Sequence, residues 1–208
     1  MLGFRGRRFE IPITRSIEAV DLSWPSSEER RSESLGGNRD YCPLGRVRWT
    51  EVREFIDAER SVINRIAGAD DWEGCYAAWL EECEEDPCLA GFDLGTNALS
   101  AALAAARCLP FYGCNGGAFD DGHNDAYPLV AFFCRPEVFP FVKIASEKVQ
   151  AGLEHNHSGG LNAFGRDVDS LIDMAAALFD VRTQINGLRL RSRVEAPDDE
   201  GGKQGELF

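Results

Sequence analysis

Apolar residues recur at helical spacing from Trp49 onward in the first half of the chain. The pattern predicts a helix with Thr50 as its N-cap residue and Gly68 as its end. A second predicted helix covers residues 70–85, where acidic residues suit the first turn and Pro87 prevents continuation. We expect the two helices to pack as a pair through apolar stripes formed by Val52, Phe55, Ile56, Val62, Ile63 and Ile66 in the first and Tyr76, Trp79, Leu80 and Cys83 in the second.

The second half of the chain alternates between helical and strand-like patterns. Asp93 and Thr96 are predicted to cap an alanine-rich helix, and Asp167 is predicted to cap the last helix. Gly159-Gly160 predicts a two-residue hairpin turn, which places His157 opposite Asn162. The predicted elements are a helix over 97–108, strands over 109–114 and 129–135, a helix over 137–150 closed by Gly152, hairpin strands over 153–158 and 161–164, and a helix over 168–186 ended by Gly187.

This order of elements predicts an α+β fold. The arrangement is αββαββα, a small, mostly antiparallel sheet with helices on one face, and the helical pair precedes it. Residues 1–47 are interpreted as an N-terminal extension and linker, and residues 48–190 as a single domain. Within that domain the helical pair occupies 48–87 and the αββαββα unit 93–187. The last segment, 191–208, has the composition of a disordered tail.

Charge is concentrated in the middle of this acidic protein. Of the net charge of −13, residues 67–180 contribute 5 Lys+Arg against 19 Asp+Glu. Such a body repels a phosphate backbone, so general binding of nucleic acid by the core is not expected. No apolar run is long enough to span a membrane. Seven cysteines in no paired framework, after an N-terminus without an apolar signal region, predict reduced thiols and a cytoplasmic location.

The glycine- and aspartate-rich loop over residues 113–125 is the strongest candidate site. A loop of this length between two central strands is usually functional or disordered. Its glycines permit backbone conformations that other residues avoid, and consecutive amides in such a turn can hold an anion. The residues expected to contact a ligand are Cys114, Asn115, Gly116, Gly117 and Asn124.

The three histidines suggest a metal centre. His155 and His157 stand two apart on one predicted strand, so both rings can face one ion, and His123 lies in the glycine-rich loop. With Asp121 or Asp125 they would form a set of ligands for a divalent metal such as zinc, with a position left for water. The alternative is structural, because Leu153 and Phe164 on the same predicted face indicate that the histidines bond to backbone carbonyls in the core.

A thiol nucleophile is a further hypothesis. Cys114 would attack a substrate with His123 or His155 as the base, the Asn-Gly-Gly amides would stabilise an oxyanion, and Asp125 is a further catalytic candidate. The other six cysteines indicate instead that this chain uses thiols as small buried apolar groups.

The sequence favours a binding or regulatory protein over an enzyme. Its acidic middle suits a basic protein partner, and the loop suits a small ligand. The alternatives are a metal-dependent hydrolase with a histidine-rich site and, behind it, a cysteine-nucleophile enzyme. Each depends on the 113–125 loop meeting the 153–160 hairpin in the folded chain.

Overall fold

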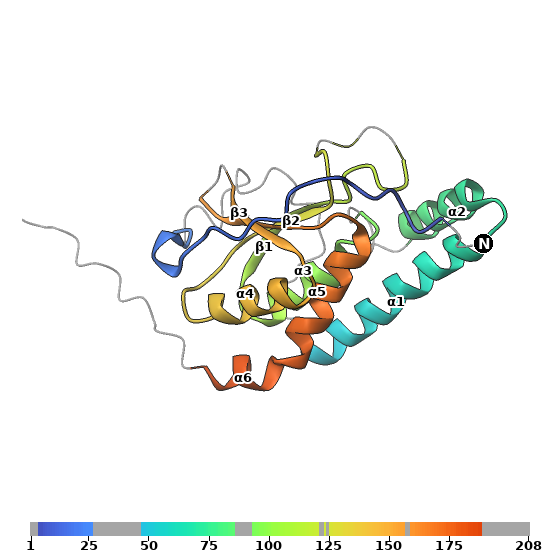
Figure 1. Ribbon diagram of the computed structural model, residues 1–208. Helices are drawn as coiled ribbons and strands as arrows, with labels where there is room; N and C mark the ends of the chain where they lie inside the picture. The colour runs from blue at the N-terminus through green and yellow to red at the C-terminus, as the bar shows by residue number, and fades with distance from the viewer. Residues whose placement is uncertain are drawn as a thin grey trace, which may run out of the picture.

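The computed structural model describes residues 4–26, 47–85, 93–120, 123, 125–156 and 159–188. A sheet lies over a layer of helices, with α1 and α2 at one end (Figure 1). The elements are η1 (Ala19–Asp21), α1 (Trp49–Gly68), α2 (Trp72–Glu85), α3 (Asn97–Ala105), β1 (Leu109–Cys114), β2 (Leu129–Phe133), α4 (Phe139–Lys148), β3 (Gly152–His155), β4 (Leu161–Phe164), α5 (Val168–Asp180) and α6 (Arg182–Gly187).

The four strands form one sheet in the order β1-β2-β4-β3, and every neighbouring pair is antiparallel. The whole of β2 is buried, as its unbroken apolar sequence LVAFF requires of a central strand. The predicted α+β fold, with its helical pair before the αββαββα unit, is confirmed.

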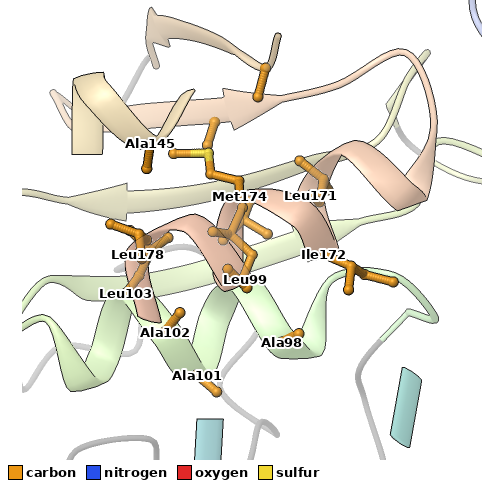
Figure 2. Packing of buried hydrophobic residues seen from close by; sticks show 14 of the residues in the cluster. Ala98, Leu99, Ala101, Ala102, Leu103, Ala145, Leu171, Ile172, Met174 and Leu178 are labelled. Atoms are coloured by element: carbon orange, nitrogen blue, oxygen red, sulfur yellow. The ribbon is translucent and has the colours of Figure 1, made fainter. Parts of the chain in front are cut away.

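The helical layer is closely packed because α3 is rich in alanine. Ala98, Ala101 and Ala102 have no exposed surface, which allows α3 to contact both α1 and α5. Figure 2 shows Leu103 of α3 beside Leu178 of α5. Small side chains at such contacts bring helix backbones together and leave the larger leucines to fill the space between them.

Both helices of the pair begin one or two residues away from their predicted starts. Helix α1 begins at Trp49 and not after Thr50, because the Glu51 carboxylate accepts the Arg48 backbone N–H at 2.6 Å. Helix α2 begins at Trp72, since the Asp71 carboxylate accepts the Gly74 N–H at 3.0 Å and so caps the first turn.

The N-terminal segment lies against the domain over residues 4–26. The Arg7 N–H donates to the Ala118 carbonyl at 2.7 Å, and the Leu153 N–H donates to the Thr14 carbonyl at 2.8 Å. This segment therefore contacts both the loop after β1 and the sheet edge at β3. Residues 27–46 and 189–208 lie outside the described part, so the predicted linker and disordered tail stay predictions.

The hairpin β3–β4 differs from the prediction. His155 pairs with Leu161 and Gly152 with Phe164, so the ladder ends at the His155–Leu161 pair and five residues, in place of two, connect the strands. Asn156 closes this connection, because its side-chain Oδ1 accepts the Gly160 N–H at 2.9 Å and its backbone N–H donates to the Gly160 carbonyl at 3.0 Å. Leu153 and His155 consequently share a face with Leu161 and Ala163, and not with Asn162 and Phe164.

Two helix ends were also predicted wrongly. Gly152 does not close α4 but begins β3, and Gln150, with φ of 59°, makes the turn between them. The last helix is divided at Val181 into α5 and α6. The predicted cap at its start is confirmed, since the Asp167 carboxylate accepts the Ser170 N–H at 2.9 Å. Within the described residues no helix has the length and apolar character needed to cross a bilayer.

Candidate metal and thiol site

The loop after β1 begins with a tight turn built by asparagine and glycine. Asn115 is fully buried, and its side-chain oxygen accepts the N–H groups of Gly117 and Ala118 at 2.9 and 3.3 Å. Gly116 and Gly117 have φ of 66° and 74°, in the left-handed region that glycine adopts without strain. The turn thus fixes the chain that leaves Cys114, the last residue of β1.

Three chemically different side chains meet at this turn. The His123 Nδ1 lies 3.0 Å from the Asp93 Oδ2 and 3.5 Å from the Cys114 Sγ. The three ligand atoms all lie within 4.8 Å of one another, which is close enough to hold one metal ion. Cys114 is 3% exposed, whereas the side chains of His123 and Asp93 are 15% and 33% exposed, so the cluster lies at the protein surface with its thiol on the inside.

The second nitrogen of the imidazole has its own carboxylate partner. The Asp120 Oδ1 lies 2.6 Å from the His123 Nε2. When Nε2–H donates to Asp120, the Nδ1 lone pair is available to a metal ion on the side of the ring where Asp93 and Cys114 lie. A carboxylate behind a histidine ligand is the usual way in which proteins fix the tautomer and orientation of that ligand.

The thiol of Cys114 is held in its neutral form in the absence of a cation. Burial raises the pKa of Cys114, and the negative charge of Asp93 raises it further. The Gly116 N–H, which donates to the sulfur at 3.4 Å, and the Asp125 N–H act in the opposite direction. A cation bound at this site would therefore lower the pKa of Cys114 and favour loss of the thiol proton.

The position of Asp93 depends on a buried glutamate of α1. The Glu59 carboxylate, 4% exposed, accepts the N–H groups of Gly95, Asn97 and Ala98 at 2.8, 3.1 and 2.9 Å. It thus caps the start of α3 from another helix, while Asp93, two residues before Gly95, accepts the Asn115 N–H at 3.0 Å. Thr96 is the N-cap residue of α3, as predicted, but its side chain makes no capping bond, because its hydroxyl donates to the Asp93 carbonyl. The predicted capping by Asp93 is wrong, because the Asp93 carboxylate faces His123.

Glu59 gives the fold a specific pH dependence. Burial raises its pKa to about 7, and the amides of Ala98, Gly95 and Asn97 oppose this shift. Since the pKa in the unfolded chain is ~4.3, the stability that this group contributes is fully present below about pH 4.3 and is lost as the pH rises through about 7. Between about pH 4.5 and about pH 8, we expect the free energy of unfolding of the native protein to fall by about 3 kcal/mol relative to that of Glu59→Gln. Urea unfolding of both proteins over this pH range measures the change. A difference that stays constant over this range would show that Glu59 does not titrate there.

The structure brings part of the predicted site together. Cys114, Asn115, Gly116, Gly117 and His123 lie at one turn, as predicted for the loop. Tyr127, two residues after the loop, contacts the hairpin, because its hydroxyl donates to the Glu154 carboxylate at 3.1 Å. Direct contact of the 113–125 loop with the 153–160 hairpin stays a prediction.

The other predicted residues lie elsewhere or are not described. His155 is exposed on β3 and is not in the cluster that contains His123. The Asp125 carboxylate accepts a hydrogen bond from the Tyr112 hydroxyl. His157, Asp121 and Asn124 lie outside the described residues, so a histidine set that includes His157 stays a prediction.

Sequence reasoning missed Asp93 and Asp120 as partners of His123. It also missed Glu59, the residue that caps the start of α3 and so positions Asp93. Asp120 stands three residues before His123, a signal that was present in the loop. Glu59 also left a signal, since it is the charged member of the buried face of α1 (Val52, Ile56, Glu59, Ile63 and Ile66). Comparison of the chain with protein families, with curated proteins and with solved structures gave no match.

Proposed function

We propose that this protein binds a divalent transition-metal ion through Asp93, Cys114 and His123, and that the 113–125 loop is its ligand site. The observation that carries the proposal is the convergence of a carboxylate oxygen, a thiol sulfur and an imidazole nitrogen within 4.8 Å. These groups come from the turn before α3, the end of β1 and the loop that follows it. Their meeting is therefore a product of the tertiary fold.

The ligand types favour zinc. Thiolate, imidazole and carboxylate together suit a borderline metal, whereas calcium and magnesium take oxygen ligands. Zinc lies about 2.0 Å from nitrogen or oxygen and about 2.3 Å from sulfur, so tetrahedral ligand atoms are roughly 3.3–3.7 Å apart. The Cys114–His123 separation of 3.5 Å fits this range, and the His123–Asp93 separation of 3.0 Å needs only a small opening. Three protein ligands leave a coordination position for water or a small ligand.

The charged groups around His123 support binding of a cation. Asp93 and Asp120 flank one imidazole, and the thiol is kept protonated by burial and by Asp93. A divalent cation would offset the two carboxylates and stabilise the thiolate, with release of the Cys114 proton. The affinity for zinc should accordingly fall as the pH is lowered.

The test is direct measurement of zinc and cobalt binding by reduced protein without an affinity tag, by equilibrium dialysis and elemental analysis. We expect one equivalent of zinc, and cobalt should show the ultraviolet thiolate-to-metal absorption that reports a sulfur ligand. Cys114→Ser and His123→Ala should weaken zinc binding at least about 100-fold, and Asp120→Asn about 10–100-fold, through the loss of the group that orients His123.

Two matched variants separate this site from adventitious binding. Cys75→Ser removes a half-buried thiol of α2, and His155→Ala removes the exposed histidine of β3. Both should retain the zinc affinity of the native chain. Native protein that takes up neither metal, or whose uptake is abolished by His155→Ala and not by His123→Ala, would contradict the proposal.

A nucleophilic thiol is the second candidate function, favoured by one observation. The Cys114 Sγ, His123 and the Asp120 carboxylate form a continuous chain with contacts of 3.5 and 2.6 Å, the order of nucleophile, base and orienting acid. Burial of the sulfur and its raised pKa oppose this function, because the attacking species is the thiolate. Selective alkylation of Cys114 by iodoacetamide in folded, metal-free protein would favour it over metal binding.

Regulation of a basic protein partner in the cytoplasm stays a prediction. It is tested by capture of a basic partner that weakens as the salt concentration rises.

A further inference from the structure

A second pair of sulfur atoms lies at the opposite end of the β1–β2 hairpin. Cys108 immediately precedes β1 and Cys134 immediately follows β2, and the neighbouring residues Leu109 and Phe133 are paired. The two sulfur atoms are 3.6 Å apart. Cys108 is 8% exposed and Cys134 is 1% exposed. The two thiols therefore contact each other inside the protein, next to the last rung of an antiparallel ladder.

This position suits a disulfide. Residues directly opposite in antiparallel strands have Cα atoms about 4.5–5.5 Å apart, and disulfides join Cα atoms about 4.4–6.8 Å apart. A bond of about 2.05 Å requires the sulfur atoms to approach by side-chain rotation, while the strand pairing fixes the backbones. Cys108 and Cys134 are separated in the chain by the whole site loop, so the spacing of the cysteines did not indicate this pair.

We propose that Cys108 and Cys134 form a reversible dithiol–disulfide pair that responds to peroxide. In the first step the sulfur of Cys108, the more exposed of the two thiols, attacks a peroxide oxygen, the O–O bond breaks, and a sulfenic acid and water are formed. In the second step the other sulfur attacks the sulfenic sulfur, the S–O bond breaks, and a second water leaves. Two thiols and one hydrogen peroxide thus give one disulfide and two waters, and an external dithiol reverses the change.

The disulfide would close the chain segment that contains Cys114 and His123, two of the three residues of the metal and thiol site. Cross-linking residues 108 and 134 removes conformations of the unfolded chain and should raise the melting temperature. Cys114 and His123 are outside the pair, so this inference does not depend on metal binding.

The test is to treat the folded protein with hydrogen peroxide, remove the oxidant, alkylate the remaining thiols under denaturing conditions and map the fragments. Trypsin leaves Cys108, Cys114 and Cys134 in one peptide because no Lys or Arg lies between residues 108 and 134. A protease that cleaves after aromatic residues is therefore needed, because cleavage after Phe111, Phe119 and Phe133 separates all three cysteines. We expect fragments linked through Cys108 and Cys134, released by dithiothreitol, and a melting temperature several degrees above that of the reduced protein.

Cysteine variants test whether the disulfide forms specifically between Cys108 and Cys134. Cys108→Ala and Cys134→Ala should each abolish both the linked fragments and the rise in melting temperature, while Cys75→Ala should retain them. The mapping of native protein decides the question even if a variant fails to fold. Oxidised native protein without a Cys108–Cys134 link, or with Cys114 linked equally often, would overturn the proposal.

Discussion

Replacement of Glu59 by alanine is expected to lower the free energy of unfolding by about 3–5 kcal/mol. The variant leaves the N–H groups of Gly95, Asn97 and Ala98 without their acceptor and opens a cavity beneath the start of α3. Each buried donor that loses its partner costs about 1–3 kcal/mol, less what water recovers. The midpoint of urea unfolding near neutral pH measures the loss.

Two further variants identify the cause. Glu59→Gln keeps one acceptor oxygen but turns an NH₂ group toward amide donors, so we expect a smaller loss than for alanine. That loss should shrink as the pH rises through about 7, because the variant carries no buried charge. Glu54→Ala removes an exposed carboxylate from the same helix and should change stability by less than about 0.5 kcal/mol. Equal, small effects of all three variants would show that α3 does not depend on Glu59.

Glu59 also links the stability of the fold to the metal and thiol site. It holds Gly95 in place, and the chain two residues earlier presents Asp93 to His123 and to the Asn115 N–H. A shift of that turn would move one ligand of the cluster while leaving Cys114 and His123 on their own loop. In Glu59→Ala, therefore, zinc affinity should fall even in the fraction of molecules that remains folded.

Local patterns in the sequence predicted most elements because each element has a local cause. The run LPFYGC matches β1 from Leu109 to Cys114, and Asp167 caps α5 as its position before an apolar helix implies. The hairpin register was wrong because Asn156, a single side chain, ends the ladder and widens the connection. The glycine pair alone contained no information about this competing hydrogen bond.

The candidate site was predictable only where its residues are close in sequence. Cys114, His123 and the glycine turn belong to one loop, and their grouping was expected. Asp93 reaches the site because α3 packs beside β1, a tertiary contact that no spacing along the chain reveals. The interpretation of Asp93 as a helix cap failed for the same reason, since the capping group comes from α1.

Replacement of Gly116 by alanine should disrupt the site turn, with a loss of stability of about 3 kcal/mol or more. A Cβ atom on Gly116 would lie 2.3–2.7 Å from the backbone atoms C, Cα and N of Tyr127, and φ of 66° is already unfavourable for alanine. Backbone cannot move aside as a flexible side chain can, so the loop between Cys114 and His123 must leave its position. Zinc affinity should consequently fall about 100-fold or more.

The matched control for this substitution is Gly68→Ala. A Cβ atom there meets no atom within 4 Å, and the residue lies at the end of α1, where alanine favours the helix by up to about 1 kcal/mol. Urea unfolding and zinc titration of the two variants should therefore diverge, with Gly68→Ala as stable as the native chain or slightly more stable. If Gly116→Ala kept both native stability and native zinc affinity, the turn could not be what holds the cysteine and the histidine together. Because the clash is with backbone and the strain is in φ, the polarity of the side chain should not matter. Gly116→Ser should therefore lose stability and zinc affinity as Gly116→Ala does.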